Sequence, residues 1–234
     1  MIKLQNIDFS YGAVPVLTSF SYEFSAGRFY GLYGANGSGK STLLKLITGE
    51  LEPDSGSVSP VYKTMEERAR NIGFMEQQCP EQIPLSVREV VELGRYPWRK
   101  SGKSFSVEPI LEQLNLTALQ DRSYNNLSGG EKQRVMLARV LSQDTPILLL
   151  DEPFSSLDVG KQHHFYSLLK TLAESGKCVI MVSHDVFVSR KYLDTALFLK
   201  DGKLRCYGKP EDIFTDDLFK EIYSILATKN CCYS

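Results

Sequence analysis

The sequence predicts an α/β fold with a mainly parallel sheet, an N-terminal antiparallel β subdomain and a small α-helical subdomain. Two continuous apolar runs, PILLLDE and KCVIMVSHD, are typical of strands that a parallel sheet buries on both faces. A short apolar strand that leads through a glycine-rich loop into a helix, RFYGLYGANGSGKSTLLKLITG, indicates the same class. The first residues instead alternate polar and apolar side chains, which predicts strands with one exposed face.

The composition is that of an ordinary globular protein. The chain has 234 residues, of which 42% are hydrophobic and 24% charged, enough for one large core or for a core with a small subdomain. Its formal net charge is -1, so no global field attracts it to nucleic acid, and we expect no nucleic-acid partner. No apolar run reaches the length of a spanning helix, and the N-terminus lacks the features of a signal peptide.

The first expected elements are antiparallel strands, because Phe20, Tyr22 and Phe24 alternate with polar neighbours. From Arg28 a short strand runs into the glycine-rich loop. The helix after that loop is expected to stop at Gly49, where its apolar periodicity ends. The later stretch PVYKTMEER is interpreted as a charged surface excursion.

The middle of the chain has a different character. Between Gln77 and Leu127, the stretches LSVREVVELGR and VEPILEQLNL both have helical period, and prolines and a glycine punctuate the sequence. We interpret residues 78–127 as a small helical subdomain. Residues 1–77 and 128–234 then form the core together with the antiparallel β subdomain.

A phosphate-binding loop is predicted between the first core strand and its helix. The stretch GANGSGKST fits the pattern G-x-x-x-x-G-K-[ST] in the context that confirms it. Its glycines let backbone N–H groups wrap phosphates, Lys40 reaches the outer phosphates, and the Ser41 hydroxyl faces Mg²⁺. An ordinary glycine turn would leave Lys40 unexplained, so we predict a P-loop NTPase core. The predicted nucleotide-binding residues here are Gly34, Asn36, Gly37, Ser38, Gly39, Lys40, Ser41 and Thr42.

Two carboxylates, Asp151 and Glu152, end the apolar run ILLLDE. Charges so close to a core are costly unless they meet a metal or a partner, so we assign Asp151 as the Mg²⁺ carboxylate. Glu152 is then placed to polarise an attacking water. The alternative is that Glu152 only favours the N-terminus of the next helix, ahead of Pro153.

His184 follows another apolar run, CVIMVS. A lone histidine in such a place is more often structural than catalytic. However, the P-loop, the two carboxylates and His184 all follow the carboxyl ends of predicted parallel strands, and open α/β sheets bind ligands at that edge. The shared location favours His184 as a contact of the γ-phosphate.

A second glycine loop, LSGGEKQR, opens a later helix. Ser128 and its paired glycines present backbone N–H groups and a positive helix dipole, but this loop has no P-loop lysine. It is therefore an anion site that cannot hold a nucleotide alone. A two-fold dimer would resolve this, since each chain's second loop could close over the nucleotide held by the other chain's first loop.

These motifs together resemble a known family. GANGSGKST, LSGGEKQR, ILLLDEP, SSLD and VSHD, in this order, look like the ATP-binding subunit of an ABC transporter over essentially the whole chain. The resemblance implies ATP with Mg²⁺ as cofactors and a homodimer or pseudo-dimer with two ATP molecules buried between signature and P-loop. It also implies that Glu152 is the catalytic base, that His184 contacts the γ-phosphate, and that the chain is an ATP hydrolase.

Further site residues follow from the resemblance alone. Tyr11 in FSYG matches the aromatic residue that stacks on adenine. Gln77 in IGFMEQ matches the glutamine that senses Mg²⁺ and the attacking water, with Gln78 as an adjacent rival. Asp158 in SSLD matches the aspartate that communicates across the dimer. The signature residues that the resemblance assigns to the partner's nucleotide are Ser128, Gly129 and Gly130.

The stretches LSVREVVELGRYPWR and YGKPEDIFTDDLFKEIY are similar to ATPases of importers for iron–siderophore complexes, haem or cobalamin. That similarity implies integral membrane permease subunits as partners, an external substrate-binding protein, and a location on the cytoplasmic face of the membrane. The ATPase subunit of an exporter and a soluble, non-transport ABC-type ATPase are the alternatives. The absence of heptads and the near-zero charge count against the second.

The five cysteines are odd in number and irregularly spaced, which fits a reduced cytoplasmic protein. Cys178 and Cys206 are expected to pack as small hydrophobic side chains. For Cys231 and Cys232, metal binding, a lipid anchor and a frayed tail without a role are the interpretations.

Overall fold

A computed structural model describes residues 1–101, 105–155, 157, 159–215, 217–218 and 221. Asp158, Cys231 and Cys232, to which the sequence assigned roles, lie outside the described residues. In the part that is described, no helix is both long and apolar enough to cross a bilayer.

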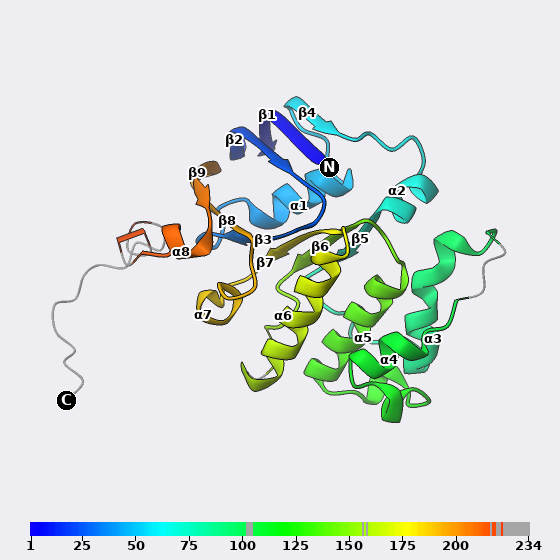
Figure 1. Cartoon of the computed structure of the whole chain (residues 1–234). Helices are drawn as coiled ribbons and strands as arrows, with labels where there is room; N and C mark the ends of the chain where they lie inside the picture. Colours follow the sequence, from blue (N-terminus) through cyan, green and yellow to red (C-terminus); the bar gives the residue numbers. More distant parts are fainter. Residues whose placement is uncertain (102–104, 156, 158, 216, 219–220, 222–234) are drawn as a thin grey trace, which may run out of the picture.

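A six-stranded sheet forms the centre of the molecule (Figure 1). Its first five strands are mutually parallel, and the last pairs antiparallel with its neighbour, so the mainly parallel sheet is confirmed. In spatial order the strands are β5 (Ile72–Met75), β6 (Ile147–Asp151), β7 (Cys178–Val182), β3 (Arg28–Tyr33), β8 (Thr195–Lys200) and β9 (Lys203–Gly208).

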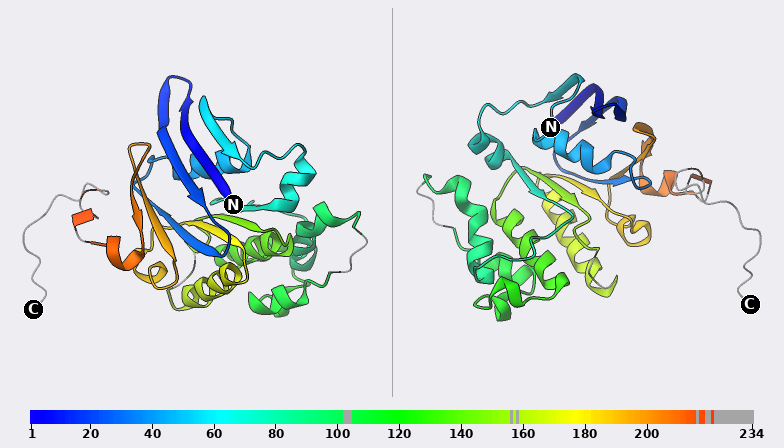
Figure 2. Two further views of the ribbon diagram at one scale, coloured as in Figure 1. Left: turned by 45° about the horizontal axis from the view of Figure 1, so that its top comes forward. Right: turned by 180° about the vertical axis from the view of Figure 1, so that it is seen from behind.

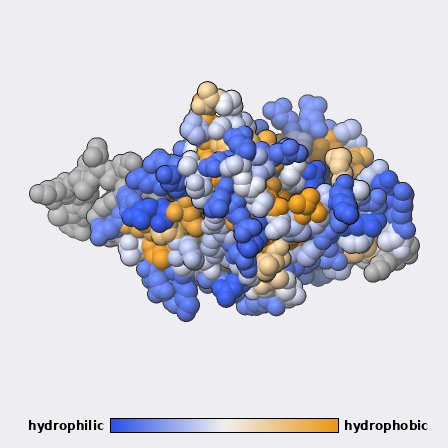
Figure 3. Space-filling model, turned by 90° about the horizontal axis from the view of Figure 1, so that it is seen from above, coloured by the Kyte–Doolittle hydropathy of each residue, from blue (hydrophilic) through white to orange (hydrophobic). Residues whose placement is uncertain are grey.

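A separate antiparallel sheet contains β2 (Val14–Phe24), β1 (Ile2–Tyr11) and β4 (Ser55–Ser59). The predicted alternation is confirmed, since Phe20 and Phe24 are buried and Tyr22 is half-buried, while Ser21 and Glu23 are exposed. From the side that carries this sheet, the surface is mostly hydrophilic, with apolar residues divided into small patches (Figure 3).

Helix α1 (Lys40–Thr48) lies between the two sheets (Figure 2). Leu43 and Leu44 are fully buried in a hydrophobic cluster to which both sheets contribute. The helix ends at Gly49 as predicted, because this residue adopts a left-handed φ of 71° that glycine tolerates.

The opposite face of the central sheet is covered by α5 (Gly129–Ser142) and α6 (Val159–Glu174). Strand β6 contributes to both layers: Leu149 packs with α1, whereas Leu148 and Leu150 pack in the cluster of α5 and α6. A strand buried on both faces needs apolar residues at every position, which accounts for the continuous run in the sequence.

The middle segment consists of short helices, and the three longest of them, with six residues each, pack against α5. They are α3 (Val87–Glu92), η1 (Leu93–Trp98), α4 (Glu108–Gln113), η2 (Thr117–Leu119) and η3 (Tyr124–Asn126). Both predicted helical stretches are confirmed, although α3 and α4 have only six residues each. Ser86 caps α3 through a capping box with Glu89, which starts the helix one residue later.

Three further short helices complete the described chain: α2 (Met65–Asn71), α7 (Val186–Ser189) and α8 (Pro210–Ile213). The stretch interpreted as a charged excursion ends within the first turn of α2. The Thr64 side chain accepts a hydrogen bond from the Glu67 N–H, and this cap turns a charged surface segment into a helix with no buried residue.

Candidate functional site

The predicted site residues follow the ends of four neighbouring strands, at one edge of the central sheet (Figure 1). The P-loop follows β3, Asp151 ends β6, and His184 comes two residues after β7. Gln77 lies two residues beyond the end of β5. Because these strands are parallel and adjacent, their carboxyl ends meet at the same edge, so residues more than a hundred positions apart in the chain converge there.

Two glycines are required by the shape of the P-loop. Gly34 has a φ of 150°, and a Cβ atom there would lie 2.3 Å from the Leu199 carbonyl oxygen. Gly39, at the start of α1, has a φ of 101°, and its Cβ would lie 2.8 Å from the Leu17 side chain. Only glycine fits both positions, and the chain turns there directly into the N-terminus of α1.

Lys40 is buried at the centre of this loop. Its Nζ atom donates hydrogen bonds to the carbonyl oxygens of Gly34 at 2.8 Å and Ala35 at 2.9 Å. Burial lowers the pKa of Lys40, while the nearby charges of Asp151 and Glu152 raise it. The ammonium thus sits among backbone acceptors that phosphate oxygens could replace, as the P-loop assignment requires.

Asp151 has the properties of a metal ligand. Its side chain is 5% exposed, and burial raises the pKa of its carboxyl, partly offset by a hydrogen bond from the Ser41 hydroxyl. Its Oδ1 atom is buried and has no hydrogen-bond partner among the described residues. One unsatisfied carboxylate oxygen next to a hydroxyl matches the few protein ligands that Mg²⁺ uses when phosphates and waters supply the rest. The two residues therefore fit a magnesium ion.

Glu152 and His184 face each other at this edge. The Glu152 Oε1 atom lies 2.9 Å from the His184 Nε2 atom, and the two side chains are 15% and 43% exposed. Glu152 has a φ of 50°, unusual for a residue with a side chain, and its N–H donates to the Val182 carbonyl oxygen at 3.1 Å. The next helix, α6, begins at Val159, seven residues further along the chain.

The second glycine loop forms the N-terminus of α5. The Ser128 hydroxyl and N–H both donate to the Glu131 carboxylate at 2.7 Å, and the Glu131 N–H donates to Ser128 Oγ, a complete capping box. Ser128 and Gly129 are exposed, and a Cβ atom on Gly129 would meet nothing within 4 Å. Within the described residues, no hydrogen bond joins this loop to the P-loop of the same chain.

The residues assigned by resemblance alone lie as follows. Tyr11 ends β1, is 51% exposed and contacts Phe9 edge to face. Gln77 and Gln78 are both exposed after β5, so the geometry does not separate them. Their roles stay predictions.

Sequence reasoning missed two buried polar residues of α6. Gln162 and Tyr166 are one helical turn apart and contact the loops that carry Glu152 and His184. Their i, i+4 spacing could have indicated that both lie on the buried face of the helix. Nothing in the sequence shows that this face contacts those two loops.

The sequence matches a family model described as ABC transporter over residues 17–155. Among curated relatives, the hemin import ATP-binding protein HmuV of Thermobifida fusca is 35% identical over 233 residues, covering 96% of this chain and 82% of the relative.

Solved structures give the same result. The dimeric structure of MJ0796, a bacterial ABC transporter cassette, has a TM-score of 0.81 at 31% identity and covers 90% of this chain and 99% of that one. A chain of a metal-chelate type ABC transporter in an inward-facing conformation has a TM-score of 0.79 at 27% identity and covers 94% of this chain and 88% of that one.

Proposed function

Because this chain belongs to the ABC transporter family of ATP-binding proteins, we propose that it hydrolyses ATP to drive import of haem or a related iron chelate. The observation that carries the proposal is the convergence of Lys40, Asp151, Glu152 and His184 at one sheet edge. The cargo rests on the names of the curated relatives, which are hemin import subunits.

Each residue of the edge has a distinct task in hydrolysis. Lys40 and the N-terminus of α1 stabilise negative charge on the phosphates. Magnesium, held by Ser41 and Asp151, supplies further positive charge when it is bound. The Glu152 carboxylate accepts a proton from the attacking water. His184, whose Nε2 atom lies 2.9 Å from Glu152 Oε1, orients that carboxylate and contacts the terminal phosphate.

Two copies of the chain complete each other's sites. The N-terminus of α5, with Ser128, Gly129 and Gly130, presents backbone N–H groups near the surface, of which that of Ser128 is held by Glu131, and it lacks a phosphate-binding lysine. It contacts the nucleotide held by the P-loop of a partner copy, with Tyr11 against the adenine and Asp158 at the junction. The dimeric form of the related cassette supports this arrangement.

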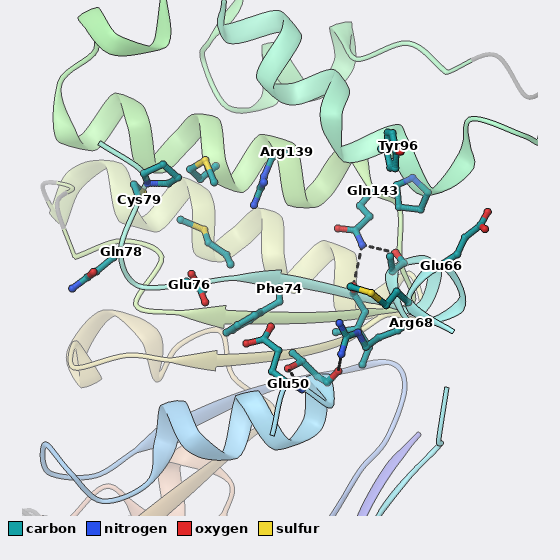
Figure 4. Close-up of a pocket in the computed structure, with 18 of the residues that line it drawn as sticks. Glu50, Glu66, Arg68, Phe74, Glu76, Gln78, Cys79, Tyr96, Arg139 and Gln143 are labelled. Carbon is teal, nitrogen blue, oxygen red and sulfur yellow. Dashed lines mark hydrogen bonds between the residues drawn. The ribbon is translucent and has the colours of Figure 1, made fainter. Parts of the chain in front are cut away.

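A groove of about 650 Å³ is the proposed contact with a membrane permease (Figure 4). It lies between β5 and α2 on one side and η1 and α5 on the other. Methionine and aromatic side chains, which adapt to varied helix surfaces, give it an apolar lining that includes Met65, Phe74, Met75, Tyr96 and Met136.

Arg139 gives the groove a chemical preference. Its guanidinium points from α5 into the groove (Figure 4), and burial lowers its pKa. Among the described residues it has no ion pair and no hydrogen bond, unlike Arg68, which donates to the Thr48 carbonyl oxygen at 3.0 Å. A half-buried cation without a partner favours an acidic side chain on the helix that docks there.

The groove also adjoins the ATP edge. Glu76 and Gln78 line it and flank Gln77, which follows β5. The helical subdomain of residues 78–127 therefore passes closure of the dimer to the permease, whose substrate is delivered by an external binding protein. We therefore propose that the chain lies on the cytoplasmic face of the membrane.

The test is affinity purification of the tagged chain from detergent-solubilised membranes of its native cell. We expect a polytopic membrane protein in near-equal amount in the wild type and a large loss of it with Arg139→Glu. The control is Arg190→Glu, which makes the same charge change at an exposed arginine outside the groove and should keep the membrane protein bound. Recovery of only soluble or ribosomal partners would contradict the transport function.

A further inference from the structure

A pocket of about 360 Å³ adjoins the Glu152–His184 pair. The loops after β6 and β7 form two of its walls, and α6 forms the third. Its polar lining, apart from that pair, includes Gln162, Tyr166 and Ser183. These three residues have no part in the hydrolysis described above, although each is nine-tenths buried or more.

Gln162 leaves one hydrogen-bonding atom unused in this pocket. Its Nε2 atom donates to the carbonyl oxygens of Leu157 at 3.1 Å and Phe154 at 3.4 Å, so the amide nitrogen and oxygen cannot be exchanged. The Oε1 atom is buried and accepts no hydrogen bond from any described residue. A buried amide oxygen without a donor costs about 1–3 kcal/mol, so a donor is expected.

A hydroxyl pair leaves one hydrogen unused. Tyr166 Oη lies 3.2 Å from Ser183 Oγ, and Ser183 Oγ also accepts a hydrogen bond from the Asp185 N–H at 3.0 Å. Two hydroxyls carry two hydrogens, and their mutual contact uses one of them. Burial raises the pKa of Tyr166 to about 12, so its proton stays in place. The second hydrogen makes no hydrogen bond within the described chain.

We propose that this pocket binds an ordered water molecule that joins Gln162 Oε1 to the Tyr166–Ser183 hydroxyl pair. The water donates to the free amide oxygen and accepts the free hydroxyl hydrogen, and its second hydrogen is available to the Glu152 carboxylate. Buried waters typically make about three hydrogen bonds, and a pocket of this size and polarity has room for one.

The water site makes Gln162 and Tyr166 positioning residues. Gln162 holds the loop that follows Glu152, and Tyr166 holds Ser183, which precedes His184. Both lie on one face of α6, one turn apart, so a single rigid helix sets the separation of the two catalytic loops. This inference rests on the proposed role of Glu152 and His184 in hydrolysis.

The direct test is a crystal structure of the nucleotide-free chain at a resolution that shows waters. We expect a water within hydrogen-bond distance of Gln162 Oε1 and of Tyr166 Oη or Ser183 Oγ. A protein donor on Gln162 Oε1, or a side chain filling the pocket, would overturn the proposal.

The kinetic test is Tyr166→Phe, which removes the hydroxyl and keeps the ring. We expect kcat for ATP to fall about tenfold with KM unchanged, since positioning of the catalytic pair is disturbed while nucleotide contacts are kept. The matched control is Tyr192→Phe, because Tyr192 stacks on Tyr166 and bonds His163 Nδ1 at 2.9 Å, outside the pocket.

The two hypotheses fail differently. If Glu152→Gln abolishes hydrolysis while Tyr166→Phe and Tyr192→Phe have the same kcat, the water site is wrong and the proposed function stands. If Glu152→Gln hydrolyses ATP normally, the assigned base is wrong whatever the pocket contains.

Discussion

The pair proposed for catalysis, Glu152 with His184, depends on a backbone conformation that few residues adopt. Glu152 has a left-handed φ of 50°, held by the hydrogen bond from its N–H to the Val182 carbonyl oxygen. This conformation turns the carboxylate toward His184 on the neighbouring strand end. Residues held in uncommon conformations cluster at functional sites, where the surrounding structure stabilises them. The apolar sequence before Glu152 predicted its location, but not this contact.

Glu152→Gln should separate binding from hydrolysis. The amide keeps the size of the side chain but cannot accept a proton from water, so we expect kcat to fall by about 10²–10⁴ while the affinity for ATP is kept. Steady-state hydrolysis and calorimetric titration measure the two quantities. Glu174→Gln, on the exposed end of α6, is the control. Near-normal hydrolysis by Glu152→Gln would remove it from the role of base.

Asp151→Asn should remove the response to magnesium. The carboxylate oxygen without a partner becomes a neutral amide group, which binds Mg²⁺ far more weakly. In the wild type, we expect ATP with Mg²⁺ to raise Tm more than ATP with EDTA does. In the variant, the two Tm values should coincide, and a persistent difference would show that other residues hold the metal.

At the scale of elements, a helix or strand could be predicted from the sequence where its own residues carry the pattern, and could not where it depends on contacts with distant residues. β6 and β7 were predicted because burial on both faces leaves an unbroken apolar run. Helix α2 was missed because it buries nothing and owes its start to one cap at Thr64. The convergence of Gln162 with the loop after Glu152 could not be predicted, because the hydrogen bonds depend on how α6 docks.

Gly94→Ala should destabilise the contact between η1 and α5. A Cβ atom at Gly94 would lie 2.0 Å from the Arg139 carbonyl oxygen and 2.1 Å from Ser142 Oγ, so the helices must separate. We expect a loss of about 1–3 kcal/mol in the free energy of unfolding, measured by urea denaturation. Gly129→Ala is the control, since nothing lies within 4 Å of its Cβ, and its stability should stay near that of the wild type.

The capping box of α5 should make stability depend on pH. Hydrogen bonds from the Ser128 hydroxyl and N–H lower the pKa of Glu131 in the folded state. A lowered pKa contributes stability that is present above the unfolded value of about 4.3 and is lost as pH falls through the folded value. Wild type should therefore have a higher Tm than Glu131→Gln at pH 7, and the difference should shrink under acid. Glu112→Gln, on the exposed side of α4, should show no such trend.

At the scale of the whole molecule, the sequence predicted the sheet edge and the second glycine loop, and the structure adds the groove around Arg139. The edge follows from the order of motifs and strands. The groove around Arg139 combines β5, α2, η1 and α5, and only the folded chain brings these elements together. Among the described residues, no hydrogen bond joins the exposed N-terminus of α5 to the P-loop of its own chain. The proposed dimer pairs it with the P-loop of a second copy instead.

The measurement that tests this account most directly is the molar mass of Glu152→Gln by light scattering, with and without ATP and Mg²⁺. Because ATP is bound but not hydrolysed, the mass should double when nucleotide is added. The double variant with Ser128→Arg should bind ATP at its own P-loop and stay monomeric. A monomer that carries ATP in Glu152→Gln, or a dimer that forms equally well with Ser128→Arg, would contradict a site shared between two chains.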